Sequence, residues 1–222
     1  MNNKIITIDG PSGSGKGTIA AIVAKNLGWR VLDSGALYRL TGLQARNQNA
    51  DFDDVHILGE IAGHLQVEFR GGKILLEKRD VTDSIRSETA GNDASRVAVV
   101  AQVRAALLGW QQRFATSQGL VADGRDMGTV IFPRAALKIF LTASAEERAL
   151  RRYKQLKEKG MPVILASLVE EIRERDERDM NRSEAPLRAA DDALMIDSSA
   201  LTIDEVVEQI LAQAREHCDL PL

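Results

Sequence analysis

The sequence predicts an α/β protein in which a five-stranded parallel sheet lies between two layers of helices. Short aliphatic runs alternate along the chain with stretches of helix-forming length, a pattern typical of strand–helix–strand units with parallel strands. The first aliphatic run also opens into a glycine-rich loop followed by a helix, an arrangement that can bind phosphate. With 222 residues, 44% of them hydrophobic, the chain can bury one sizeable core, and its length allows one domain or two.

The first strand leads into a predicted phosphate-binding loop. The β-branched run ending at Ile8 is followed by the pattern G-x-x-x-x-G-K, complete from Gly10 to Lys16. Glycines allow successive N–H groups to point into one concavity, and the helix predicted over 18–27 adds its positive end. Gly17 stands where serine or threonine is usual, which leaves Thr18 as the candidate magnesium ligand of the loop. The residues predicted to bind a nucleoside triphosphate are Gly10, Pro11, Ser12, Gly13, Ser14, Gly15, Lys16, Gly17 and Thr18.

A second strand and a helix are expected next. The strand covers 29–33, and the turn that ends it can cap a helix over 36–47. Because ligands bind at the carboxyl ends of parallel strands, Asp33, Ser34 and Arg39 are expected near the phosphate loop. An ordinary capping turn with a solvated arginine is the alternative interpretation.

Residues 51–90 interrupt the strand–helix rhythm and are interpreted as a small α+β insertion. Glycine-hinged insertions of this kind can close over a substrate. The expected elements are a helix from Asp51 to about Gly63, a hairpin whose strands 65–69 and 73–77 flank Arg70-Gly71-Gly72, and a short strand near 80–82.

The next core strand ends in an acid. A helix is predicted over 92–116 from its apolar spacing, and the buried-type strand 119–123 then ends at Asp123. A carboxylate beside a phosphate loop is placed to steer magnesium. Two further strands, over 137–141 and 193–197, complete the sheet.

Two charged helices are predicted between the last two strands. Ser144 and Glu147 are spaced as a capping box for the first helix, and a break at 160–162 separates it from a second helix over 163–182. On that second helix Arg175, Arg178, Asp179 and Arg182 share one side; alternatively, Glu171 with Arg175 and Glu174 with Arg178 form pairs on a solvated face. The last helix is expected over 203–217.

Composition narrows the class of protein. The single cysteine, Cys218, excludes an internal disulfide and indicates the cytoplasm. No apolar run is long enough for a membrane span, no signal peptide is expected, and a net charge of −3 argues against bulk nucleic-acid binding. Arginines in separate segments exceed what one nucleotide requires, which favours phosphoryl transfer over hydrolysis; they are Arg39, Arg125, Arg148, Arg152, Arg175 and Arg182.

Four segments, 8–18, 33–39, 122–129 and 175–182, together resemble the bacterial-type cytidylate kinase family. The resemblance spans nearly the whole chain in order. It implies one nucleoside monophosphate kinase domain of the phosphate-loop kinase fold, with ATP as donor, CMP and dCMP as acceptors, and Mg²⁺. The implied parts are a core over 1–50, 91–150 and 183–222, a monophosphate-binding insertion over 51–90, and a short lid with flanking helices over 151–182.

The resemblance also implies a role for each candidate residue. Lys16, Arg125, Arg182 and Asp123 would be catalytic, and Asp123 would hold magnesium through water. Arg148 and Arg152 would cover the donor. The acceptor phosphate would be held by Arg39, Arg125 and Arg182 beside Ser34, the sugar by Arg175 and Asp179, and the base by Ser95, Arg104 and Asp126.

Two alternatives remain open from the residues alone. One is a kinase for another monophosphate such as UMP, and the other is an ATPase or switch module that needs no second nucleotide. A carboxylate opposite the amino group of cytosine would face a carbonyl in uracil, and that mismatch costs about 1–3 kcal/mol. We expect a monomer acting on small-molecule nucleotides, without nucleic-acid or membrane partners.

Overall fold

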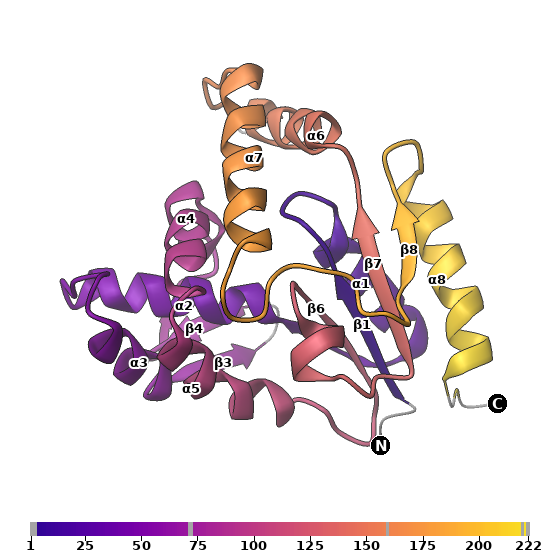
Figure 1. The fold of residues 1–222 in the computed structure, drawn as a ribbon, viewed down its shortest axis with the longest axis horizontal. Coiled ribbons are helices and arrows are strands. Elements are labelled where there is room, and N and C mark those ends of the chain that lie inside the picture. Colours follow the sequence, from indigo (N-terminus) through magenta and orange to yellow (C-terminus); the bar gives the residue numbers. More distant parts are fainter. Residues whose placement is uncertain (1–3, 71–72, 159, 219, 221–222) are drawn as a thin grey trace. The chain divides into compact units, whose positions relative to one another are not determined.

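The larger of the two sheets has five strands (Figure 1). The computed structural model describes residues 4–70, 73–158, 160–218 and 220. The strand order is β2-β6-β1-β7-β8, and the pairs β1–β6, β1–β7 and β7–β8 are parallel. This confirms the predicted α/β class with its five core strands. Their bounds are β1 Ile5–Asp9, β2 Arg30–Asp33, β6 Leu120–Gly124, β7 Leu137–Thr142 and β8 Leu194–Asp197.

The chain divides into two compact units, residues 1–32 with 114–222, and residues 33–113. This division assigns 33–50 and 91–113 to the unit that contains the predicted insertion, whereas the sequence analysis assigns them to the core. The predicted assignment of core, insertion and lid stays a prediction. The two units are described separately below.

The first unit contains the sheet and four helices: α1 Lys16–Leu27, α6 Ala145–Glu158, α7 Leu165–Met180 and α8 Ile203–His217. Alternate residues of the central strands, such as Ile8 and Ile139, share one buried cluster with Val23 of α1 and Ile210 of α8. Period-two alternation gives each strand a second face, where a Cβ added to Gly128 would lie 2.8 Å from the hydroxyl of Thr7. The last helix agrees with its predicted bounds.

The second unit packs helices against a three-stranded sheet of order β3-β4-β5. The hairpin prediction is confirmed by the antiparallel pairing of β3 with β4; Gly71 and Gly72 of its predicted turn lie outside the described residues. Its elements are α2 Ser34–Asn47, α3 Val55–Gly63, β3 Val67–Arg70, β4 Lys73–Leu76, β5 Arg79–Asp80, α4 Glu88–Val97 and α5 Ala101–Gln112.

The prediction of a single helix over 92–116 is wrong, because α4 and α5 are two separate helices. The first begins earlier, where the hydroxyl of Ser87 accepts the N–H of Ala90. The backbone then turns extended at Val100, which precedes the first residue of α5. Apolar periodicity continues through the break, so the pattern alone does not show it.

Three other predictions about helix ends need correction. The insertion's helix begins at Val55 rather than at Asp51, because the carboxylate of Asp54 accepts the first free N–H groups. Only one half of the predicted box at α6 forms: the hydroxyl of Ser144 accepts the N–H of Glu147, while the N–H of Ser144 donates to the hydroxyl of Ser199. The helix predicted over 163–182 is shorter at both ends, at Leu165–Met180.

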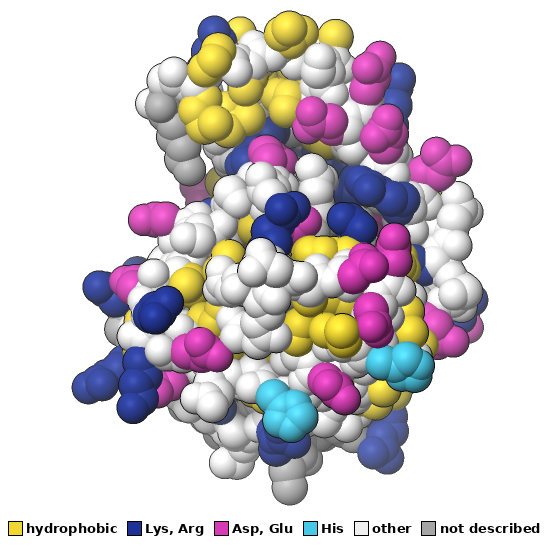
Figure 2. Space-filling model, turned by 90° about the vertical axis from the view of Figure 1, so that its left-hand side faces the viewer, with side chains coloured by type: hydrophobic (Ala, Val, Ile, Leu, Met, Phe, Trp, Pro, Cys, Tyr) yellow, Lys and Arg dark blue, Asp and Glu magenta, His cyan; other side chains and the backbone are white. Residues whose placement is uncertain are grey.

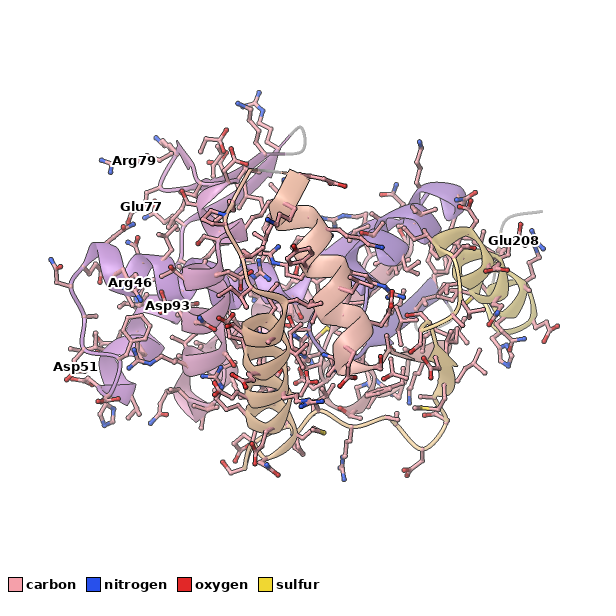
Figure 3. All side chains as sticks on the ribbon, turned by 90° about the horizontal axis from the view of Figure 1, so that it is seen from above. Arg46, Asp51, Glu77, Arg79, Asp93 and Glu208 are labelled. Atoms are coloured by element: carbon pink, nitrogen blue, oxygen red, sulfur yellow. The ribbon has the colours of Figure 1, made fainter. Side chains whose placement is uncertain are left out.

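Close helix contact holds the second unit together. A Cβ added to Gly42 in α2 would lie 2.7 Å from the Cβ of Asp93 in α4, so only glycine allows this approach. Arg46, one turn further along α2, forms a two-bond ion pair with Asp93, and Figure 3 shows the two side chains together. None of the described helices is long and apolar enough to cross a bilayer.

Candidate active site

The loop after β1 has the glycine-dependent backbone expected of a phosphate-binding loop. Gly13 and Gly15 have φ values of 77° and 89°, which residues with a Cβ rarely adopt. The loop leads directly into α1, so the positive end of that helix lies next to it. The ammonium of Lys16 donates to the carbonyl of Pro11 at 3.0 Å. The buried hydroxyl of Ser14 has no hydrogen-bond partner within the described part of the chain, so a phosphate oxygen would satisfy it.

Asp9, the last residue of β1, holds the segment that follows β6. Its two carboxylate oxygens accept the N–H groups of Met127 and Gly128, each at 2.8 Å. Burial raises the pKa of Asp9 to about 6, although the two hydrogen bonds lower it. The nearby charge of Asp126 adds to the rise. The sequence analysis assigned Asp9 no role, although an acid closing a buried aliphatic strand was a usable signal. Through these bonds Asp9 fixes the turn that follows Asp126.

Lys16 lies among charged groups brought together from distant parts of the chain. Burial, with the neighbouring charge of Arg125, lowers the pKa of Lys16 to about 7. Arg175 lowers the pKa further, while Asp123 and Asp179 oppose the change. Five of the predicted site residues therefore share one electrostatic environment.

Asp179 in α7 connects two of the predicted phosphate-binding arginines. Its carboxylate accepts from Arg125 at 2.7 Å and lies 3.3 Å from a terminal nitrogen of Arg182. Burial would raise the pKa of Asp179, but Arg125 and Arg182 outweigh it and hold the pKa below its ordinary value. All three side chains are largely shielded from water, at 18% exposure or less. Arg125 and Arg182 thus form a cationic group whose two positive charges are partly balanced by the carboxylate of Asp179.

The arginines predicted to cover the donor are on α6. Arg148 is buried, and its guanidinium donates to the carbonyl of Ser12 in the phosphate loop at 2.9 Å. It also forms a two-bond ion pair with Asp176 of α7, a residue that the sequence analysis did not single out. Arg152, one turn further on, is half-buried and lies 3.5 Å from Gln155 on its own helix.

The remaining predicted acceptor residues belong to the second unit. Arg39 donates to the carbonyl of Ile85 at 2.9 Å, and Ser34 is buried in the first turn of α2. In the following helices the buried hydroxyl of Ser95 has no hydrogen-bond partner among the described residues. Arg104 lies 3.4 Å from the carbonyl of Ala98. The structure therefore places the predicted acceptor residues in two sets, one in each unit.

Apolar side chains gather where α7 begins. Met161, Ile164 and Leu165 are exposed, and Figure 2 shows yellow side chains gathered at the top of the view, where α7 begins in Figure 1. Gly160 has a φ of 73° at the predicted break between the two helices. This is the segment that the sequence analysis interpreted as a lid.

The carboxylate of Asp123 suits a magnesium ion bound together with phosphates. A Cβ added to Gly17 would lie 3.7 Å from one oxygen of Asp123, so the carboxylate faces the start of α1. The described residues hold no cluster of three or more ligating side chains. Magnesium commonly binds one or two carboxylates and completes its coordination shell with water and phosphate oxygens. Asp123 and the exposed Thr18 fit this type of coordination.

The comparisons with known proteins agree over nearly the whole chain. The family model described as cytidylate kinase matches residues 6–216. A cytidylate kinase of Stutzerimonas stutzeri is 58% identical over 96% of this chain and 95% of its own. A cytidylate kinase of Nitrosomonas europaea is 54% identical over 97% of this chain and 98% of its own. A crystal structure of an uncharacterized protein from Eubacterium ventriosum, 13% identical, covers 95% of this chain and 98% of its own with a TM-score of 0.50, a likeness of fold alone.

Proposed function

The chain belongs to the cytidylate kinase family, and we propose that it transfers the terminal phosphoryl group of ATP to CMP and dCMP. The observation that carries the proposal is the grouping of Lys16, Arg125 and Asp179 beside the phosphate loop. In this proposal the loop with Lys16 would bind the donor, and Arg125 and Arg182, both paired with Asp179, would bind a second phosphate. An enzyme that only hydrolyses ATP would not need this second phosphate site.

The donor would bind through the loop Gly10–Thr18. Its N–H groups would hold the inner phosphates, and Lys16 would neutralise the charge of the migrating group. Arg148 and Arg152 would act on the donor side, and the segment over about 152–168 would close over it to exclude water. Asp123, through water, and Thr18 would hold the Mg²⁺ that accompanies ATP, and this ion would neutralise phosphate charge.

The acceptor would bind through both sets of predicted residues. Arg39, Arg125 and Arg182 would hold its phosphate beside Ser34, and Arg175 and Asp179 would contact the sugar hydroxyls. Ser95, Arg104 and Asp126 would read the base: a carboxylate accepts from the amino group of cytosine, and the other two can donate to its ring nitrogen and carbonyl. The buried hydroxyl of Ser95, for which the described part of the chain provides no hydrogen-bond partner, supports this part of the proposal.

The reaction needs no protein nucleophile. An ionised oxygen of the monophosphate attacks the terminal phosphorus of ATP, the bond to the bridging oxygen breaks, and ADP leaves with that electron pair. A general base adds little, because the attacking oxygen already carries negative charge at neutral pH. The side chains of this protein therefore contribute alignment and charge neutralisation.

A coupled assay of ADP release tests the acceptor and its base. We expect CMP and dCMP to be used at least about fivefold better than UMP, from the mismatch at the amino group. Replacing Asp126 with alanine should reduce this preference, whereas replacing the exposed Asp191 should leave it unchanged. Release of ADP without any monophosphate would favour an ATPase, and equal use of UMP would contradict base reading by Asp126.

Binding of ATP is expected to take up a proton at pH 8. Because the pKa of Lys16 is lowered to about 7, this lysine is mostly neutral at pH 8, and bound phosphate would restore its charge. Calorimetry in two buffers of different ionisation enthalpy should give uptake close to about one proton at pH 8 and near zero at pH 6. A Lys16→Arg variant stays charged and should take up none; equal uptake by the variant and the original protein would contradict this role.

We further propose a monomer that acts in the cytoplasm. The single cysteine suits a reducing compartment, and the net charge of −3 suits free nucleotides better than nucleic acid. Light scattering with and without ATP and CMP would test the monomer directly.

A further inference from the structure

Arg148 joins three segments of the first unit at one buried point. Its Nε donates to the carbonyl of Ala143 at 2.9 Å, just before α6. Its Nη1 donates to the carbonyl of Ser12 at 2.9 Å and to Asp176 at 3.0 Å, and its Nη2 donates to the second oxygen of Asp176 at 2.5 Å. The guanidinium therefore bonds at once to the phosphate loop, to the segment just before α6 and to α7.

The ion pair with Asp176 determines how the guanidinium is oriented. The side chains of Arg148 and Asp176 are only 5% and 13% exposed. A planar guanidinium bound to both oxygens of a carboxylate is fixed in rotation as well as in position. Since Nη1 serves both Asp176 and Ser12, the same orientation fixes where the loop carbonyl is held.

The phosphate loop lies directly against this arginine. A Cβ added to Gly13 would lie 3.3 Å from the Cβ of Arg148, so the loop backbone packs on the side chain as well as bonding to it. A peptide plane carries its carbonyl and the following N–H rigidly together. Holding the carbonyl of Ser12 therefore sets the direction of the N–H of Gly13, which is a backbone donor of the loop.

We propose that Asp176 is a positioning residue for the donor nucleotide, acting through Arg148 on the phosphate loop. This inference rests on the proposed function, in which that loop binds ATP. Asp176 holds Arg148 in the one orientation that reaches Ser12, and the loop is thereby shaped for phosphate before ATP arrives. Without the carboxylate, part of the binding free energy of ATP would be spent on ordering the loop.

The chain offers a matched control. Arg173 and Glu146 form a second ion pair between the same two helices, with both side chains more than half exposed. Neither residue has a described hydrogen bond to the phosphate loop. Removing this pair deletes a link between α6 and α7 without touching Arg148.

The test compares the affinity for ATP, in the absence of CMP, among Asp176→Asn, Asp176→Ala, Arg148→Lys and Arg173→Gln variants. Calorimetry should show ATP binding weakened about tenfold in the first three, while Arg173→Gln stays within about twofold of the original protein. KM for CMP should change less than KM for ATP. The double variant Arg148→Lys, Asp176→Asn should bind ATP as tightly as the weaker-binding of the two single variants, because both changes act through one set of contacts.

Other outcomes separate this inference from the proposed function. Unchanged ATP affinity in Asp176→Asn would overturn the inference and leave the kinase intact. Equal rises in KM for ATP and CMP, with a matching loss of thermal stability, would mean that Asp176 only stabilises α7. That result would also overturn the inference. An original protein that binds no ATP would overturn the proposed function and this inference with it.

Discussion

Replacing Gly10 with alanine is expected to lower the free energy of unfolding by more than about 4 kcal/mol. A Cβ at this position would lie 2.0 Å from the carbonyl oxygen of Leu141 and 3.1 Å from its carbonyl carbon. Both are backbone atoms, so no rotamer change can relieve the contact. Leu141 lies in β7, which is paired on both sides, and β1 leading into Gly10 is paired on both sides as well.

Urea unfolding of the purified variants measures the effect, with solubility on expression as a first indication. Gly28→Ala is the matched control: its φ of 65° also favours glycine, but an added Cβ would meet no atom within 4 Å. That variant should lose only about 1 kcal/mol. If both variants lost similar stability, steric exclusion by Leu141 would not be the reason for glycine at position 10.

The parts of the fold that the sequence predicted are those determined by local patterns. The five core strands and the phosphate loop follow from aliphatic runs and glycine spacing, both of which are read within about ten residues. The break at Val100 was missed because inward-facing apolar residues continue on both sides of it. A regular pattern thus predicts that a segment is helical better than it predicts where one helix ends.

The candidate site was predictable in its residues but less so in its contacts. Lys16 and Asp123 follow from the loop and from the acid at a strand end, whereas Ser95 and Arg104 came from the resemblance to a family. The roles of Asp9 and Asp176 depend on side chains far apart in the chain: 118 residues separate Asp9 from Met127. Such pairings are set by packing, and no local pattern encodes them.

Asp179 illustrates the same limit within a residue that was predicted. The family resemblance alone places it at the sugar of the acceptor. The structure adds that its carboxylate bonds to Arg125 and is paired with Arg182. Asp179 therefore has two candidate roles: contact with a sugar hydroxyl, and orientation of the two arginines. The two roles predict different kinetics for its variants.

Replacing Asp179 with alanine is expected to lower kcat/KM for CMP by at least about 30-fold, since removing one partner of a buried charge pair costs about 2–5 kcal/mol. Arg125 and Arg182 would lose the counter-charge that positions them, so both phosphate alignment and charge neutralisation would suffer. Steady-state kinetics at saturating ATP measures the loss. Asp192→Asn is the control, because Asp192 also pairs with a largely buried cation, Lys138, and has no proposed role in the site.

Asparagine at position 179 separates the two roles. It retains hydrogen-bonding groups that can reach the sugar but carries no charge to hold the arginines. If Asp179 acts through Arg125 and Arg182, Asp179→Asn should lower kcat nearly as much as Asp179→Ala, with CMP and dCMP affected alike. If it acts only at the sugar, the asparagine variant should keep kcat and show a modest rise in KM. The lowered pKa of Asp179 keeps its charge throughout the neutral range, so the loss of kcat should be the same at pH 6 and pH 8. A loss that varied across that range would mean that the substitution acts through a group that titrates there, such as Lys16 with its pKa of about 7, rather than through the two arginines.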